Sequence, residues 1–198
     1  MSWSRLIDTD FAQRARAWHE SDPRRSYHNW HHVERLFWHA KNTFELAWDA
    51  ELDEAIIGHD VIYDALADKE IRSTEWLVSN NPGATYGARV HVLKTIDHLP
   101  SRDNRMVLLD LADMLYPETV DSNFELIRQE SQALYGLSDA VFAENNMRYL
   151  TGLLTRISPA SLVGLPVADR LAFLGIRQGA ERAIAIGRRL LADTREPV

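Results

Sequence analysis

Residues 55 to 64 read Ala-Ile-Ile-Gly-His-Asp-Val-Ile-Tyr-Asp, so His59 and Asp60 interrupt an otherwise apolar run. A carboxylate buried in such surroundings is destabilising unless it is paired with a cation or bound to one. Upstream, residues 27 to 32 read Tyr-His-Asn-Trp-His-His, which adds a second group of metal-ligating side chains. Because imidazole and carboxylate are common metal ligands, the two segments together predict a metal site.

The spacing of apolar residues around these segments predicts an all-α fold. Apolar residues recur mostly three and four positions apart, and no long alternation of Val and Ile suggests a sheet. We expect helices, in chain order, over residues 4–19, 29–48, 52–63, 69–79, 85–99, 103–115, 120–135 and 139–157, followed by final helices up to residue 193. The helix over 52–63 would carry His59 and Asp60 as neighbours near its C-terminal end.

The length of 198 residues predicts one domain, residues 1–198, with the helices from about residue 160 packing on the core. No internal repeat, low-complexity segment or strong composition shift marks a boundary. The net charge of −7 comes from well-mixed acidic and basic residues, which makes long nucleic acid an unlikely partner. We expect a monomer or a homodimer.

The absence of cysteine excludes disulfides, cysteine-ligated zinc and a thiolate nucleophile, so a metal would be held by His and carboxylate. No apolar stretch approaches the roughly 18 residues that a membrane span requires, and acidic residues stand where a signal peptide would have its apolar core. The sequence therefore predicts a cytoplasmic protein without a membrane segment.

Helical spacing groups some of the candidate ligands. His28 and His32 lie four positions apart and would share a helix face, as would His28 and His31. A further acid, Asp110, stands in the apolar segment 107–112. Mixed imidazole and carboxylate ligands suit Mn²⁺, Fe²⁺, Zn²⁺ or Ni²⁺, whereas Mg²⁺ usually prefers oxygen ligands.

Six short segments, taken in order, resemble the HD-domain metal-dependent phosphohydrolase superfamily. The similarity is closest to a branch of predicted phosphohydrolases of about this chain length, and it fades after Glu130. The segments are Tyr-His-Asn-x-x-His at 27–32, His-Asp-x-x-Tyr-Asp at 59–64, Asn-Glu-x-x-Ser at 69–73 with lysine in place of asparagine, Thr-x-x-His at 95–98, Asp-Leu at 110–111 and Ile-Arg-x-Glu at 127–130.

This resemblance implies an HD-type helical bundle with a metal site between central helices. His32, His59, Asp60 and Asp110 would ligate one divalent ion, such as Mn, Mg, Fe, Zn or Ni, and a second ion is an open alternative. The branch commonly has another acid two residues before the last ligand, where this chain has Leu108. The last ligand is therefore Asp110 or Asp113, and the Leu-Ala that follows Asp110 favours Asp110.

The implied activity is hydrolysis of a nucleotide or another small phosphorylated metabolite, by attack of metal-activated water on phosphorus. The resemblance leaves open whether the bond cleaved belongs to a phosphomonoester, a phosphodiester or a pyrophosphate. Asp60 and Glu70 are the candidate catalytic residues, Glu70 as an outer acceptor or general base. The candidate substrate contacts are His28, Tyr63, Lys69, Arg72 and His98, with a solvated helix face as the alternative for Lys69 and Arg72.

Two other functions compete with hydrolysis. Some HD folds hold two irons and activate dioxygen, and His28 and His98 would supply the extra ligands. The other is a nucleotide sensor without turnover, against which the intact set of four metal ligands argues. We expect His98 to share one helix face with His91 and Thr95, and His31 to point away from the site.

Overall fold

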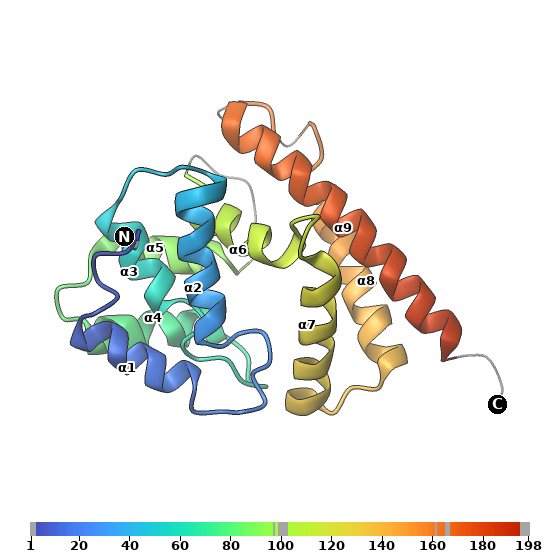
Figure 1. The fold of residues 1–198 in the computed structure, drawn as a ribbon, viewed down its shortest axis with the longest axis horizontal. Coiled ribbons are helices and arrows are strands. Elements are labelled where there is room, and N and C mark those ends of the chain that lie inside the picture. Colours follow the sequence, from blue (N-terminus) through green and yellow to red (C-terminus); the bar gives the residue numbers. More distant parts are fainter. Residues whose placement is uncertain (1–2, 97, 99–102, 161, 165–166, 195–198) are drawn as a thin grey trace.

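The computed structural model describes residues 3–96, 98, 103–160, 162–164 and 167–194, and within these residues it is all-helical, as the sequence predicted. The helices, labelled in Figure 1, are α1 (Asp10–His19), α2 (Trp30–Trp38), a π-helical turn η1 (His39–Thr43), α3 (Ala50–Gly58), α4 (Lys69–Asn80), α5 (Tyr86–Lys94), α6 (Arg105–Leu115), α7 (Val120–Tyr135), α8 (Asp139–Arg156) and α9 (Val167–Asp193).

Several helix starts follow from local capping. The side chains of Thr9, Asn29, Asp49, Thr85 and Ser138 each accept a backbone N–H from the first turn of the helix that follows. Such caps satisfy donors that the first turn leaves unpaired. At the other end of α7, Gly136 adopts a left-handed conformation (φ 65°), which glycine tolerates without a steric penalty.

The first predicted helix, over 4–19, begins six residues later than expected, because a buried carboxylate holds the preceding segment. The hydroxyl of Ser4 and the backbone N–H of Arg5 donate to Asp53 at 2.6 and 2.8 Å. Trp48 donates its indole N–H to the same carboxylate at 2.9 Å. Asp53 thereby attaches the segment before α1, and Trp48 after η1, to α3. Neither segment extends its neighbouring helix.

Two further predicted helices end earlier than expected, and a left-handed residue follows each of them within the predicted range. The helix over 29–48 gives way to η1 after Trp38, and Glu45 has a φ of 48°. The helix over 85–99 ends at Lys94, and His98 has a φ of 49°. A left-handed residue is incompatible with continuing a right-handed helix, so both predictions were too long.

The helix predicted over 52–63 was wrong at its C-terminal end. It ends at Gly58, and His59 turns into an extended conformation with φ −71° and ψ 151°. Asp60 follows in a left-handed conformation with φ 50°. His59 and Asp60 therefore lie in the loop after α3 and not on a helical ridge.

Two apolar cores lie on opposite sides of α6. The first is built from α1 to α5 and takes Met106 and Leu109 from α6. The second is built from α7 to α9 and takes Leu108 and Leu111 from the same helix. Figure 1 shows α6 between the two groups of helices, with the single long helix α9 lying along α8 in place of the several final helices expected.

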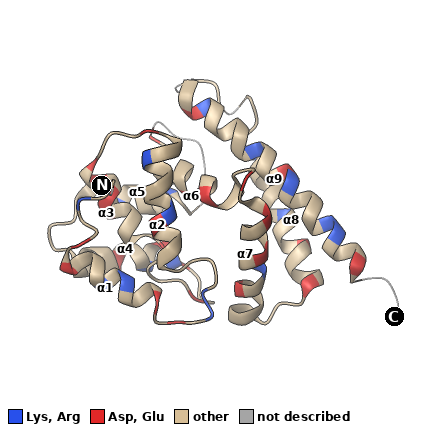
Figure 2. Cartoon of the chain, in the orientation of Figure 1, with Lys and Arg blue, Asp and Glu red and all other residues tan. Residues whose placement is uncertain are grey.

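Figure 2 shows Lys and Arg interspersed with Asp and Glu over the helices, with both signs present along α9. This agrees with the mixed charge pattern of the sequence. Within the described part of the chain, none of the helices has the length and apolar character needed to cross a membrane.

Candidate metal centre

The four predicted metal ligands come together in a buried cluster. His32 projects from α2, His59 and Asp60 from the loop after α3, and Asp110 from α6. One ligand atom from each lies within 4.8 Å of the others, and the group could hold a metal ion. The Nε2 atoms of His32 and His59 are 3.0 Å apart. Residues from three separate segments thus converge beside the central helix.

Asp113 lies behind His32 and not in the cluster. Nδ1 of His32 bonds to the Asp113 carboxylate at 2.7 Å, while its Nε2 is 3.5 Å from Oδ1 of Asp110. The guanidinium of Arg35 donates twice to Asp113, at 2.7 and 2.9 Å, and the hydroxyl of Tyr27 donates at 2.9 Å. Of the two acids left open by the sequence, Asp110 faces the cluster, and Asp113 orients the histidine from behind.

The ring of His59 is held by the end of α3. Its Nδ1 donates to the carbonyl of Ile56 at 2.9 Å, which leaves a lone pair on Nε2 in the neutral ring. That Nε2 lies 3.5 Å from Oδ2 of Asp60. The early end of α3 therefore fixes the tautomer that a metal ligand needs.

Arg25 holds the left-handed turn that presents Asp60. It is 5% exposed, and its guanidinium donates to the carbonyls of Asp60, Val61 and His28 and bonds to Nδ1 of His19. Left-handed backbone at a non-glycine residue costs about 1–3 kcal/mol and persists only when its surroundings impose it. The carbonyl contacts of Arg25 supply that constraint.

The cluster carries negative charge that a proton or a cation has to balance. Burial raises the pKa of Asp60, but His59 and His28 outweigh it and hold the pKa at about 2. Burial also raises the pKa of Asp110, yet hydrogen bonds from His32 and His98 keep it well below its usual value. Both carboxylates are therefore ionised in a buried site, where uncompensated negative charge is costly.

Whether a metal fits the cluster depends on the protonation of its two histidines. Burial lowers the pKa of His32, but Asp110 and Asp113 raise it to about 9, while burial leaves the pKa of His59 below its usual value. With both Nδ1 atoms bonded to oxygen acceptors, the two facing Nε2 atoms accommodate either one shared proton or one cation. Two imidazole nitrogens and two carboxylates match a divalent transition ion in both ligand type and charge.

The cluster adjoins a cavity of about 280 Å³. Several residues singled out in the sequence line it: His28, Tyr63, Lys69, Glu70, His98 and Asp110. Asp110 belongs to both the cluster and the cavity wall, so a molecule in the cavity would lie next to a bound ion.

His28 is stacked on Tyr63 with their ring centres 3.7 Å apart. Its Nδ1 bonds to the Glu130 carboxylate, which also accepts the backbone N–H groups of Tyr27 and His28. The opposite ring nitrogen, Nε2, lies 3.9 Å from Oδ2 of Asp60. Glu130 thus turns the free nitrogen of His28 toward the cluster.

His98 and Lys69 reach the same cavity from other segments. Nε2 of His98 donates to Asp110 at 2.9 Å, and the hydroxyl of Tyr149 on α8 bonds to Nδ1 at 3.1 Å. Lys69 places its ammonium group 3.8 Å from the centre of the Tyr63 ring. The expected helical stripe of His91, Thr95 and His98 does not exist, because α5 ends at Lys94.

Arg72 is the candidate substrate contact that lies elsewhere. It pairs with Asp64 at 2.6 Å and lines a separate cavity together with Arg25 and Trp18. His31 is exposed and pairs with Glu34 at 2.9 Å, away from the cluster.

Sequence reasoning missed the supporting roles of Arg25, Asp113 and Glu130, and the cavity residues Asn146 and Tyr149. Two of these had a signal: Asp113 was one of two candidate acids, and Glu130 ends the Ile-Arg-x-Glu segment. Arg25, Asn146 and Tyr149 stand in no motif, and only the packing of distant segments brings them to the site.

Searches with family models, curated proteins and solved structures found no match to this chain.

Proposed function

We propose that this protein is a divalent-metal-dependent phosphohydrolase of the HD type, acting on a small phosphorylated molecule such as a nucleotide. The observation that carries the proposal is the convergence of two histidine nitrogens and two ionised, buried carboxylates beside a cavity. The lysine and histidines of the cavity wall suit an anionic ligand, whereas the overall charge of the chain is negative.

His32, His59, Asp60 and Asp110 would hold the ion. A divalent ion supplies Lewis-acid stabilisation of the phosphoryl charge and lowers the pKa of water. The ammonium group of Lys69 is available to phosphate oxygens, and His28 lines the same cavity. Among the described residues that line the cavity, Glu70 is the carboxylate outside the four proposed metal ligands, and in this proposal it accepts the proton of the attacking water.

The decisive experiment combines metal analysis with a hydrolysis screen. Purified protein is stripped with a chelator, reloaded with Mn²⁺, Mg²⁺, Fe²⁺, Zn²⁺ or Ni²⁺, and assayed for phosphate release from nucleotides and simple phosphoesters. We expect one ion per cluster and metal-dependent release. An absence of release with every ion and every ester would refute the proposal.

A matched pair of variants tests the site itself. Asp60→Asn keeps the shape and tolerates the left-handed turn, but removes a ligand charge, so activity should fall by at least ~100-fold. Asp68→Asn is the control, because Asp68 is exposed and also left-handed, with φ 61°. We expect the control to keep wild-type activity and metal content.

A specific observation also favours the di-iron oxygenase. The Nε2 atom of His28 faces Asp60, and His98 contacts Asp110. Two more imidazoles therefore flank the cluster. Two tightly bound irons per chain, with oxygen consumption and without phosphate release, would support the oxygenase in place of the hydrolase.

A further inference from the structure

His98 is bonded differently from the two histidines of the metal cluster. In His32 and His59, Nδ1 bonds to an oxygen acceptor, so in the neutral ring the lone pair of Nε2 faces the cluster. Nε2 of His98 instead lies 2.9 Å from Oδ2 of Asp110, and because an ionised carboxylate only accepts, this Nε2 carries the proton. The lone pair of the neutral His98 ring is then on Nδ1, 3.1 Å from the hydroxyl of Tyr149, which donates to it. His98 is thus held in the tautomer opposite to that of His32 and His59.

Both ring nitrogens of His98 are engaged in these bonds. A second ion or a phosphate oxygen would reach either nitrogen only by displacing Asp110 or Tyr149. His28, another imidazole beside the cluster, differs in this respect, because its Nε2 is 3.9 Å from Oδ2 of Asp60, beyond hydrogen-bond distance. The contacts of His98 therefore favour an action through Asp110 over direct contact with an ion or a phosphate.

The bond from His98 gives the two oxygens of Asp110 different surroundings. Oδ2 accepts from His98, whereas Oδ1 lies 3.5 Å from Nε2 of His32, on the side of the cluster. A donor to one oxygen restricts the rotation of the carboxylate, and ligating carboxylates depend on such outer bonds. His98 therefore acts on Asp110 as Asp113 acts on His32.

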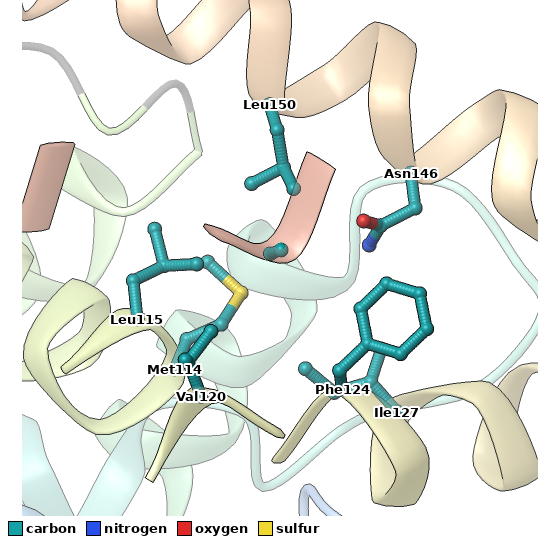
Figure 3. Close-up of a pocket in the computed structure, with 8 residues that line it drawn as sticks. Met114, Leu115, Val120, Phe124, Ile127, Asn146 and Leu150 are labelled. Carbon is teal, nitrogen blue, oxygen red and sulfur yellow. The ribbon is translucent and has the colours of Figure 1, made fainter. Parts of the chain in front are cut away.

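Tyr149 belongs to a helix that is closely packed in the second core. Its neighbour Leu150 is 1% exposed, and Figure 3 shows Leu150 and Asn146 extending from α8 toward Val120 and Phe124 of α7. The cavity between these side chains has a volume of about 10 Å³, which is about the space of one water molecule. Close packing restricts the movement of α8, so the Tyr149 hydroxyl has a defined position beside the loop after α5.

We propose that His98 and Tyr149 are positioning residues for Asp110. Tyr149 fixes the ring of His98 from α8, and His98 fixes the carboxylate so that its Oδ1 serves the ion. His98 is then neither a ligand of a second ion nor a phosphate contact, and α8 belongs to the site although no motif marks it. This inference rests on the metal binding that the proposed function requires, but not on the ester that is hydrolysed.

The first experiment determines the tautomer of His98 in the metal-free protein. Ring ¹⁵N NMR at about pH 8, above the usual pKa of histidine, distinguishes a protonated from an unprotonated ring nitrogen, and His98→Gln identifies the signals. We expect the proton on Nε2 in wild type. Tyr149→Phe should shift the Nδ1 signal of His98, whereas Tyr86→Phe, which alters a tyrosine that is 75% exposed, should leave it in place.

The second experiment measures the Kd and the stoichiometry of Zn²⁺ by calorimetric titration. His98→Gln keeps an N–H donor close to the position of Nε2 but replaces imidazole by an amide, which is not a usual zinc ligand. This variant should bind one ion per chain, with a Kd within about threefold of wild type. His98→Leu lacks the donor and should weaken binding by about 10- to 100-fold, the usual cost of losing an outer partner.

Three comparisons exclude a merely structural effect. Gln and Leu are both unbranched at Cβ, so the left-handed backbone of His98 (φ 49°) affects both variants alike. His31→Gln changes an exposed histidine away from the cluster and should keep the wild-type Kd. Tyr149→Phe should raise the Kd by about 2- to 10-fold in wild type, the effect of one hydrogen bond, and should have no further effect in His98→Leu.

The outcomes separate this inference from the function on which it rests. A proton on Nδ1 of His98 in wild type, a loss of bound ions in His98→Gln, or an unchanged Kd in His98→Leu overturns the positioning role, as does a Tyr149→Phe effect that persists in His98→Leu. Because these measurements use no ester, an absence of phosphate release refutes the hydrolase and leaves the positioning role standing. A wild-type protein that binds no ion refutes both.

Discussion

Asp113 shows how a residue outside the cluster controls a ligand inside it. It accepts the Nδ1 proton of His32 and is itself held by two bonds from Arg35. Burial raises the pKa of Asp113, but His32 and His39 outweigh it, and the pKa lies well below its usual value. The carboxylate is therefore charged, and it increases the basicity of the ligand that faces Asp110.

We expect Asp113→Asn to weaken metal binding by about 10- to 100-fold, the usual cost of losing an outer partner of a ligating histidine. The measurement is the Kd for Mn²⁺ or Zn²⁺ by calorimetric titration of the chelator-treated protein. Asp121→Asn is the control, because Asp121 also binds an arginine through two bonds, with Arg182, but at the surface. A Kd for Asp113→Asn within twofold of wild type would contradict the assigned role.

His19 gives a pH dependence that does not involve a metal ligand. It is fully buried and bonded to Arg25 through Nδ1. Burial, reinforced by Arg25, lowers its pKa well below the usual 6.5. Above pH 6.5 the ring is neutral in both folded and unfolded protein, whereas below that pH only the unfolded chain takes up the proton.

The free energy of unfolding should therefore fall by up to about 1.4 kcal/mol per pH unit below pH 6.5 on account of this ring. His19→Gln keeps an acceptor for Arg25 but does not titrate. Urea unfolding from pH 7.5 down to pH 5 should show a shallower decline for His19→Gln than for wild type. Parallel curves for the two proteins would mean that His19 does not carry this effect.

At the scale of elements, the contact between α6 and α9 depends on one glycine. A Cβ atom at Gly179 would lie 1.5 Å from the carbonyl oxygen of Leu115, the last residue of α6. Backbone cannot move aside as a flexible side chain can, so an added methyl group would separate the two helices. The central helix would then shift relative to the second core.

We expect Gly179→Ala to destabilise the protein by about 2–3 kcal/mol through overpacking. Gly175→Ala is the matched control on the same helix, because nothing lies within 4 Å of its added Cβ. Alanine is the better helix former, so this control should be stabilising by up to about 1 kcal/mol. Chemical denaturation of both variants measures the difference, and equal stabilities would refute the close contact.

Elements with local signals were predictable, and those ended by tertiary contacts were not. The helix over 120–135 was predicted with its observed bounds, and the helix predicted over 139–157 is α8, which Ser138 caps. Arg25 holds the turn after α3 through its bond to Asp60, and Gly58 packs closely on Leu77 of α4, and both are contacts between segments that no local pattern indicates. The four residues of the candidate metal cluster were nevertheless predicted by the resemblance of their short segments to the HD superfamily, because that resemblance does not depend on where the helix ends.

At the scale of the whole molecule, α6 joins two cores and carries Asp110 between them. His32, His59 and Asp60 come from elements of the first core, whereas α6 and α9 pack together in the second. An ion bound to all four ligands would tie the first core to the helix on which the second is built. Metal binding should therefore stabilise both cores and not the first alone.

Two optical probes distinguish these possibilities. All six tryptophans lie at or before residue 76, so their fluorescence follows the first core, while helical circular dichroism includes α7 to α9. An ion at 100 times its Kd adds about 2.7 kcal/mol to the stability, which at this chain length raises the Tm by about 5–10 °C. We expect both probes to shift together in wild type and neither to shift in Asp60→Asn. A fluorescence shift without a matching shift in dichroism would mean that the cores unfold separately and that α6 does not couple them.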